Sequence, residues 1–274
     1  MLNAKFSAFI LSVLTASCHA LPEKNWEIIE HISNSMLGVP YAFSSSHDLR
    51  GPEQGDILST HSLDCMTYVT LTIALSSNHP KQWLADWLKL RYSGSYDFSG
   101  RQHFLSIDLN PTLNNDFELH DASALLPKDL VKTHHAIIHK NSWLANNLLM
   151  LCRNYKCTMR DFKEITHHAK LPPQSVDINY IPYHNIIKNN KLNPSLVSNL
   201  PRISIVEFVR EGWPIGGTAG THLAFSHLGF LIKKGDLLIL RHAKWGDKVR
   251  DEDFLKYVQN IQGDPTHLGV HILH

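Results

Sequence analysis

The chain has 274 residues, 43% of them hydrophobic, and carries 26 Lys and Arg against 25 Asp and Glu. This length and hydrophobic content suit one elaborated domain, or one domain with a large insertion, built around a substantial core. The balanced charge argues against non-specific nucleic-acid binding, because such binding depends on a basic surface that neutralises phosphates.

The N-terminus has the layout of a secretory signal peptide. Lys5 precedes an apolar run over residues 6–16, and the small residue Ala20 precedes the expected cleavage point. The run is too short to span a bilayer, which takes about 20 residues. Residues 14–18 loosely resemble a lipoprotein cleavage box, so lipid attachment at Cys18 is the less favoured alternative. We predict a periplasmic or secreted protein that has lost residues 1–20 and has no membrane span.

Three cysteines remain once residues 1–20 are removed. The spacing of Cys152 and Cys157 allows a disulfide across a turn but does not establish one. Cys65 is then the odd thiol in an oxidising compartment. Its composition-based interpretation is a small buried hydrophobic residue, so a reactive role has to come from its neighbours.

The first third of the chain is predicted to be helical. Apolar residues at helical spacing indicate an amphipathic helix over residues 23–37, and Gly38 ends it. The segment that starts at Cys65 is apolar almost all round, as expected of a buried helix. A further helix is predicted after Pro80.

Residues 92–202 contain only short apolar runs interrupted by Asn, Pro and His, and we interpret them as an insertion that elaborates the core. The C-terminal third is strand-like. Strands are predicted over residues 203–209, 223–232, 237–242 and 268–273, with a helix over 251–258. Helices followed by strands are typical of the α+β class.

Two histidines of the strand region are predicted to face each other. Residues 233–236 form a turn signal, and a loop centred on Lys234 and Gly235 places His227 directly opposite His242 on one face of the sheet. A three-residue loop would instead put them on opposite faces.

These histidines give Cys65 a chemical interpretation. A cysteine at a helix N-terminus near a histidine has a lowered pKa, because the helix dipole and a histidinium stabilise the thiolate. His227 can then take the thiol proton while His242 orients it, and the backbone N–H of Cys65 can stabilise an oxyanion. The pattern predicts a cysteine nucleophile.

Several short motifs, in this order, resemble the NlpC-type papain-like peptidoglycan hydrolases, and in particular their N-acetylmuramoyl-L-alanine amidase-like branch. The superfamily landmarks are Gly38-Val39-Pro40-Tyr41, Asp64-Cys65, Ser226-His227-Leu228-Gly229 and Arg241-His242-Ala243; the branch landmarks are "RYSGSYDFSGRQHF" from Arg91 and "INYIPY" from Ile178. The sequence departs from the superfamily in having Met66-Thr67 after the cysteine and an added segment over residues 213–221.

The resemblance implies an α+β papain-like core in which a catalytic cysteine helix packs on an antiparallel sheet. It implies Cys65 as nucleophile, His227 as base and His242 as orienting residue, with Tyr41 beside the cysteine. Substrate-binding positions are expected at Tyr41, Asp64, Arg101 and His103, although a structural role for the last two is an equal alternative. No metal and no organic cofactor are implied, and the expected partner is peptidoglycan or a muropeptide.

The resemblance leaves two bonds as candidates for cleavage. Most of the superfamily cuts between D-glutamate and the diamino acid, whereas the branch cuts between N-acetylmuramic acid and L-alanine. The Gly-rich segment 213–221 and the rings of Trp143, Tyr180 and Tyr183 favour the amidase, because they suit a sugar beside the cysteine. Ordinary core packing is the alternative for these rings.

Two further alternatives remain open. A zinc-dependent amidase could draw ligands from the histidine-rich middle of the chain, although no recognised metal motif is present. The candidate ligands are His134, His135, His139, His167, His168 and Asp177. A non-catalytic envelope-binding module would be expected to have lost part of the triad, and here all three positions are filled.

Overall fold

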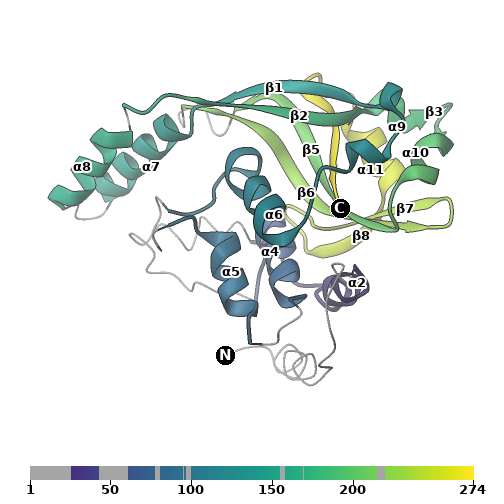
Figure 1. Cartoon of the computed structure of the whole chain (residues 1–274), viewed down its shortest axis with the longest axis horizontal. Coiled ribbons are helices and arrows are strands. Elements are labelled where there is room, and N and C mark those ends of the chain that lie inside the picture. Colours follow the sequence, from purple (N-terminus) through teal and green to yellow (C-terminus); the bar gives the residue numbers. More distant parts are fainter. Residues whose placement is uncertain are drawn as a thin grey trace.

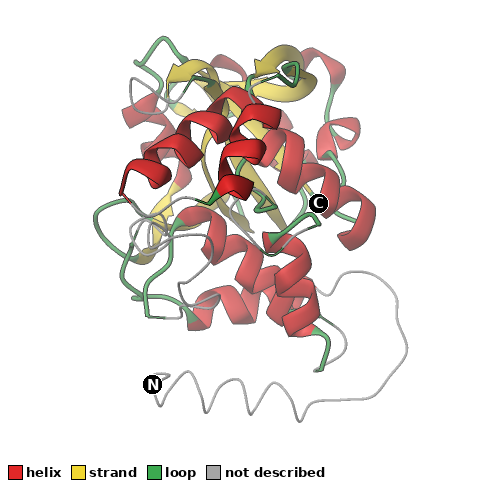
Figure 2. Ribbon diagram, turned by 90° about the vertical axis from the view of Figure 1, so that its left-hand side faces the viewer, coloured by secondary structure: helices red, strands yellow, loops and turns green. Residues whose placement is uncertain are grey.

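The computed structural model describes residues 26–42, 61–77, 81–94, 96, 100–154, 158–168, 170–214 and 220–274. Within them the protein is α+β, with a curved seven-stranded antiparallel sheet between two groups of helices (Figures 1 and 2). In spatial order the strands are β1 (Lys132–Ile138), β2 (Gln174–Pro182), β9 (His267–Leu273), β5 (Ile203–Pro214), β6 (His222–Lys234), β7 (Leu237–Ala243) and β8 (Val249–Asp253). A separate ribbon pairs β3 (Ile187–Lys188) with β4 (Lys191–Leu192).

One face of the sheet packs against the N-terminal helices. These are α2 (Trp26–Ser35), α4 (Cys65–Leu75), α5 (Trp83–Arg91) and α6 (Asn110–Phe117). Residues Tyr68 to Leu75 of α4 are all buried, which confirms the prediction of a helix buried on most sides. Leu228 and Phe230 of β6 join the same apolar cluster, so α4 is fixed directly against the central strands.

The opposite face packs against α11 (Phe254–Ile261), α9 (Tyr183–Ile186) and α10 (Pro194–Asn199). Phe208 of β5 and Leu240 of β7 point to this side. The side chains directly before and after them in each strand point to the other side of the sheet, because successive side chains of a strand alternate. Both faces are therefore covered, which explains the nearly continuous apolar runs of β5 and β6.

Residues 92–202 contribute two strands to the sheet as well as helices. β1 and β2 form a long hairpin that extends the sheet at its edge, and β2 joins β9 through Ile181 and Pro182. The middle segment also holds η1 (Leu105–Leu109), η2 (Ala122–Leu125) and η3 (Lys128–Leu130). In the described part of the chain, none of the helices combines the length and apolar character needed to cross a bilayer.

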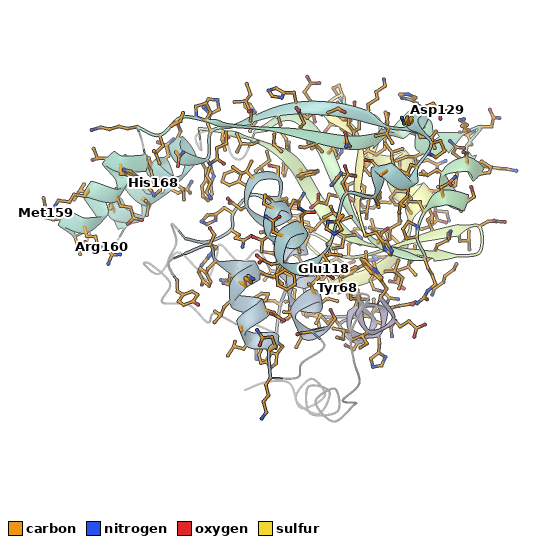
Figure 3. The ribbon with its side chains drawn as sticks, viewed as in Figure 1. Tyr68, Glu118, Asp129, Met159, Arg160 and His168 are labelled. Carbon is orange, nitrogen blue, oxygen red and sulfur yellow. The ribbon has the colours of Figure 1, made fainter. Side chains whose placement is uncertain are left out.

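A helical arm projects from the far end of the hairpin. It consists of α7 (Lys140–Asn154) and α8 (Met159–His168), and its tip carries Met159, which is 74% exposed (Figure 3). Cys152 of α7 is disulfide-bonded, while Cys157 lies outside the described residues.

Two predictions about the C-terminal third are wrong in detail. The predicted helix 251–258 begins three residues too early, because residues 249–253 form β8 and Asp253 caps α11. The β6–β7 register is shifted by two residues: Lys234 pairs with Leu237, so the loop is Gly235-Asp236. Gly235 adopts a φ of 60°, which favours glycine and explains why the turn forms there.

Candidate active site

His227 and His242 lie on one face of the sheet and are hydrogen-bonded to each other. Nε2 of His227 is 2.6 Å from Nδ1 of His242. The two residues are diagonal rather than directly opposite, because the β6–β7 register places Gly229 across from His242. The two-residue shift leaves both side chains on the predicted face, since side chains alternate with a period of two.

The chain of polar groups continues onto β8, through a residue that the sequence analysis missed. Nε2 of His242 is 2.8 Å from Oε2 of Glu252, and Lys244 donates to the other carboxylate oxygen at 2.9 Å. Glu252 pairs with Leu240 and is therefore again diagonal to His242. The predicted helix over residues 251–258 concealed this role, because it gave Glu252 no place in the sheet.

Cys65 is the first residue of α4, as predicted. Asp64 caps the helix: its carboxylate accepts from the backbone N–H of Thr67 at 2.7 Å, and the Thr67 hydroxyl accepts from the N–H of Asp64 at 2.9 Å. Asp64 thus has a structural role in presenting the cysteine.

Cys65 and the histidines approach the same part of β6 from different sides. The β6–β7 ladder ends at Phe230 and Arg241, which leaves the backbone of Leu228 outside it. The backbone N–H groups of Leu228, Met66 and Cys65 itself favour the thiolate of Cys65. Of these residues, Leu228 directly follows His227, so the sulfur and the histidine pair lie near the same part of β6.

The electrostatics differ from the expected thiolate. Burial of the sulfur, reinforced by the Asp64 carboxylate, raises the pKa of Cys65 to about 12 in spite of the backbone hydrogen bonds. Burial, together with neighbouring His242, lowers the pKa of His227 to about 3. At neutral pH the site holds a thiol and an uncharged imidazole, because desolvation outweighs the helix terminus.

Two tyrosines flank the site. Burial raises the pKa of Tyr41, and the charges of Cys65 and Asp64 raise it further; Tyr41 and Cys65 pack against the same apolar cluster. Tyr257 of α11 packs its ring 5.3 Å from the His242 ring and 6.3 Å from the His227 ring. Burial, then the charges of Glu252 and Cys65, raise the pKa of Tyr257. Sequence periodicity had given no reason to single it out.

The structure groups Arg101 and His103 with a different set of residues. Arg101 is buried, and its backbone pairs with that of Tyr92 in an isolated antiparallel β-bridge. The His103 ring contacts the Trp143 ring at a centroid distance of 4.6 Å. Trp143 and Tyr180 belong to the cluster around Phe104, which is separate from the cluster that holds Cys65.

Two other predicted substrate features have different outcomes. Tyr183 is buried on the α11 side, where its hydroxyl lies 3.3 Å from His267. Residues 215–219 of the Gly-rich segment lie outside the described residues.

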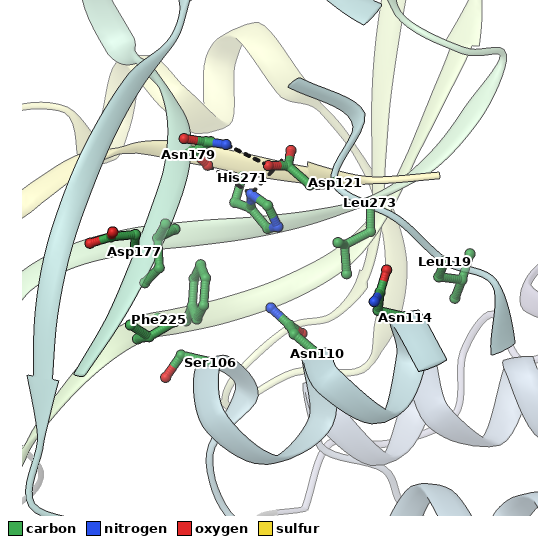
Figure 4. A pocket seen from close by; sticks show the side chains of 12 residues that line it. Ser106, Asn110, Asn114, Leu119, Asp121, Asp177, Asn179, Phe225, His271 and Leu273 are labelled. Atoms are coloured by element: carbon green, nitrogen blue, oxygen red, sulfur yellow. Dashed lines mark hydrogen bonds and ion pairs between the residues drawn. The ribbon is translucent and has the colours of Figure 1, made fainter. Parts of the chain in front are cut away.

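A cavity of about 180 Å³ lies between α6 and the sheet (Figure 4). Its lining includes Asn110, Asn179 and His271, and the ring nitrogen Nδ1 of His271 donates to the carbonyl of Asn179 at 2.7 Å. Asn110 donates to Glu207 at 2.8 Å, and burial raises the pKa of this fully buried carboxyl. Oδ1 of Asn110 and Oε1 of Glu207 are buried and have no hydrogen-bond partner among the described residues.

The histidine-rich middle of the chain was the proposed source of zinc ligands. His135 lies 2.7 Å from Asp177, and the rings of His167 and His168 are 5.8 Å apart. Among the residues that the structure describes, no group of three or more His, Cys, Asp or Glu side chains is arranged to hold a metal ion.

Comparison with known proteins gives one family and several similar folds. The family model AmiA-like, described as N-acetylmuramoyl-L-alanine amidase-like, matches residues 31–264. Protein LPG0564 from Legionella pneumophila has a similar structure, with a TM-score of 0.80 and 24% identity over 99% of this chain and 93% of its own. An N-acetylmuramoyl-L-alanine amidase from Bacteroides uniformis has a TM-score of 0.61 and 18% identity over 90% and 97% of the two chains. No curated protein sequence matches the chain.

Proposed function

The chain belongs to the N-acetylmuramoyl-L-alanine amidase-like family, and from this premise we propose that it is an exported cysteine amidase acting on peptidoglycan fragments. The observation that carries the proposal is the hydrogen-bonded pair His227–His242, which lies beside the strand residue that contacts the Cys65 thiol. A nucleophile, a base and a group that orients the base are the parts that acyl transfer through a thioester requires.

The proposed reaction begins from the uncharged thiol and imidazole. His227 takes the thiol proton as the Cys65 sulfur attacks the amide carbonyl carbon, so no stable thiolate has to form first. The proposed donors that stabilise the oxyanion are the backbone N–H of Cys65 and the Tyr41 hydroxyl. His227 then protonates the leaving amine as the C–N bond breaks, and it deprotonates the water that hydrolyses the thioester.

The proposed architecture is a single papain-like NlpC-type domain over residues 21–274, with residues 92–202 as its insertion. Support comes from α4 presenting Cys65 against an antiparallel sheet, and from β1 and β2 extending that same sheet. Export rests on the signal-like sequence of residues 1–20, which lies outside the described residues.

The proposed bond is the amide between the lactyl group of N-acetylmuramic acid and L-alanine. The test is incubation with a defined disaccharide-tetrapeptide and mass analysis of the products. Free disaccharide with an intact tetrapeptide is the expected result. A disaccharide that retains L-Ala-D-Glu would instead identify an endopeptidase that cuts before the diamino acid.

A second arm of the experiment separates the thiol mechanism from a metal mechanism. Iodoacetamide should abolish turnover, whereas a chelator should leave it unchanged. Loss of turnover with the chelator alone would favour a zinc-dependent amidase. If neither treatment matters because the native protein releases no product, the fold serves a non-catalytic role.

A further inference from the structure

Three side chains on neighbouring strands form a hydrogen-bonded row. His227 on β6, His242 on β7 and Glu252 on β8 are each displaced diagonally from the next, and each contact is a hydrogen bond of 2.6 or 2.8 Å. His242, in the middle, is 1% exposed, so water does not compete for its ring nitrogens.

Glu252 is the ionised residue at the end of this hydrogen-bonded row. Burial opposes its charge, but hydrogen bonds from Lys244 and His242 hold the pKa of the Glu252 carboxyl below its usual range. Arg250 adds a longer contact at 3.8 Å. Besides Glu252 itself, the groups that face His242 are His227, Lys244, Arg250 and the Tyr257 ring.

We propose that Glu252 is a positioning residue that sets the proton positions of both histidines. A carboxylate only accepts hydrogen bonds, so Nε2 of His242 must carry a proton and donate it to Glu252. Nδ1 of an uncharged His242 is then an acceptor, and Nε2 of His227 must donate to it. Nδ1 of His227 is left as the unprotonated nitrogen, which is the one that can take the thiol proton.

The inference rests on the proposed roles of Cys65 and His227 and adds a fourth member to them. It also gives Lys244 a part, because this side chain holds the second carboxylate oxygen and so fixes the rotation of the Glu252 headgroup. When His227 takes the thiol proton, the positive charge on the histidine pair is stabilised by Glu252 through His242.

Two substitutions and one matched control test the proposal. Glu252→Ala removes the acceptor, and Glu252→Gln keeps an acceptor oxygen but removes the charge. Asp253→Asn removes the same charge one residue further along and keeps the α11 cap, so it leaves the histidine chain intact. The readouts are the nitrogen chemical shifts of His227 and His242, which report the protonated ring nitrogen, and the rate at which iodoacetamide alkylates Cys65.

Glu252→Ala should lower the alkylation rate at neutral pH by roughly 100-fold relative to Asp253→Asn, because general-base assistance is lost. It should also mix the tautomers of both histidines. Glu252→Gln should keep the tautomers and alkylate at an intermediate rate. Alkylation by Glu252→Ala or by a folded Glu252→Gln at the rate of Asp253→Asn, with unchanged tautomers, would overturn the proposal.

These readouts use no peptidoglycan. If the wild-type protein cleaves no disaccharide-tetrapeptide, the proposed function fails, but alkylation and tautomers still decide the role of Glu252. If turnover is present, Glu252→Ala should lower kcat and leave KM unchanged, since Glu252 acts on the base and not on substrate binding.

Discussion

Gly229 lies across from His242, and the absence of a side chain at Gly229 is what lets His227 reach His242 diagonally. A Cβ atom at position 229 would lie 2.8 Å from the Cβ of His242 and 2.8 Å from the carbonyl oxygen of Arg241. Real Cβ atoms do not approach other atoms this closely, so the strands would have to separate. The glycine is therefore required by the geometry of the histidine pair.

Gly229→Ala should destabilise the protein by about 1–3 kcal/mol, as expected for overpacking, and should reduce turnover in the fraction that is still folded. Urea unfolding and activity per folded molecule measure the two effects. Gly263→Ala is the matched control, because a Cβ at Gly263 meets nothing within 4 Å. Normal activity in folded Gly229→Ala would show that the diagonal contact tolerates a shift of the strands.

Cys65→Ala and His227→Ala should each nearly abolish hydrolysis of the disaccharide-tetrapeptide and leave the thermal midpoint within a few degrees of the wild type. His242→Ala should give a large but incomplete loss, because water can partly replace an orienting group. Product formation followed by mass analysis measures all three. Wild-type turnover by Cys65→Ala would rule out the thioester mechanism.

Acidification should destabilise the fold through His227. Its pKa falls from 6.5 in the unfolded chain to about 3 in the folded protein. Between these values only the unfolded chain binds the proton, so the stability present above pH 6.5 is lost progressively as the pH falls towards 3. The loss between pH 7 and pH 4 is roughly 3 kcal/mol. Urea unfolding at both pH values should show a smaller loss for His227→Gln than for the wild type; an equal loss would place the effect in other histidines.

Substitutions at Asp64 separate helix capping from substrate binding. Asp64→Ala should cost about 1 kcal/mol of folding stability, because Thr67 loses its capping partner. Asp64→Asn keeps a capping oxygen and removes the charge that raises the pKa of Cys65, so iodoacetamide should alkylate Cys65 faster. A raised KM in Asp64→Asn, with unchanged alkylation, would instead indicate a contact with substrate.

The sequence predicted the elements whose burial leaves a periodic pattern. The helix at Cys65 is apolar all round, and β5, β6, β7 and β9 are apolar runs, so the hydrophobicity of these segments is enough to identify them. β8 contains Arg250, Asp251, Glu252 and Asp253, and no hydrophobic pattern marks such a charged edge strand. The pairing of β8 with β7 can be seen only in the structure, and for that reason the sequence did not point to Glu252.

The register error has a similar origin. Lys233 to Asp236 can form loops with different centres, and local turn preferences do not distinguish them. The structure selects Gly235-Asp236, which moves His227 and His242 from opposite to diagonal positions. The predicted lowering of the Cys65 pKa failed because the helix terminus could be inferred from sequence, whereas the desolvation of the sulfur depends on tertiary packing.

The backbone around Val39 forms hydrogen bonds with the far end of the chain. Gly38 donates to the carbonyl of Val249, Val249 donates to the carbonyl of Val39, and Tyr41 donates to the carbonyl of Asp247. These contacts join segments separated by about 210 residues, and closing such a long loop is slow in folding. During synthesis, Tyr41 and Cys65 are therefore made long before the strands that carry His227, His242 and Glu252. A chain that stops before β8 contains the proposed nucleophile Cys65 but lacks Glu252, the partner of His242, so the proposed site is complete only once β8 has been made.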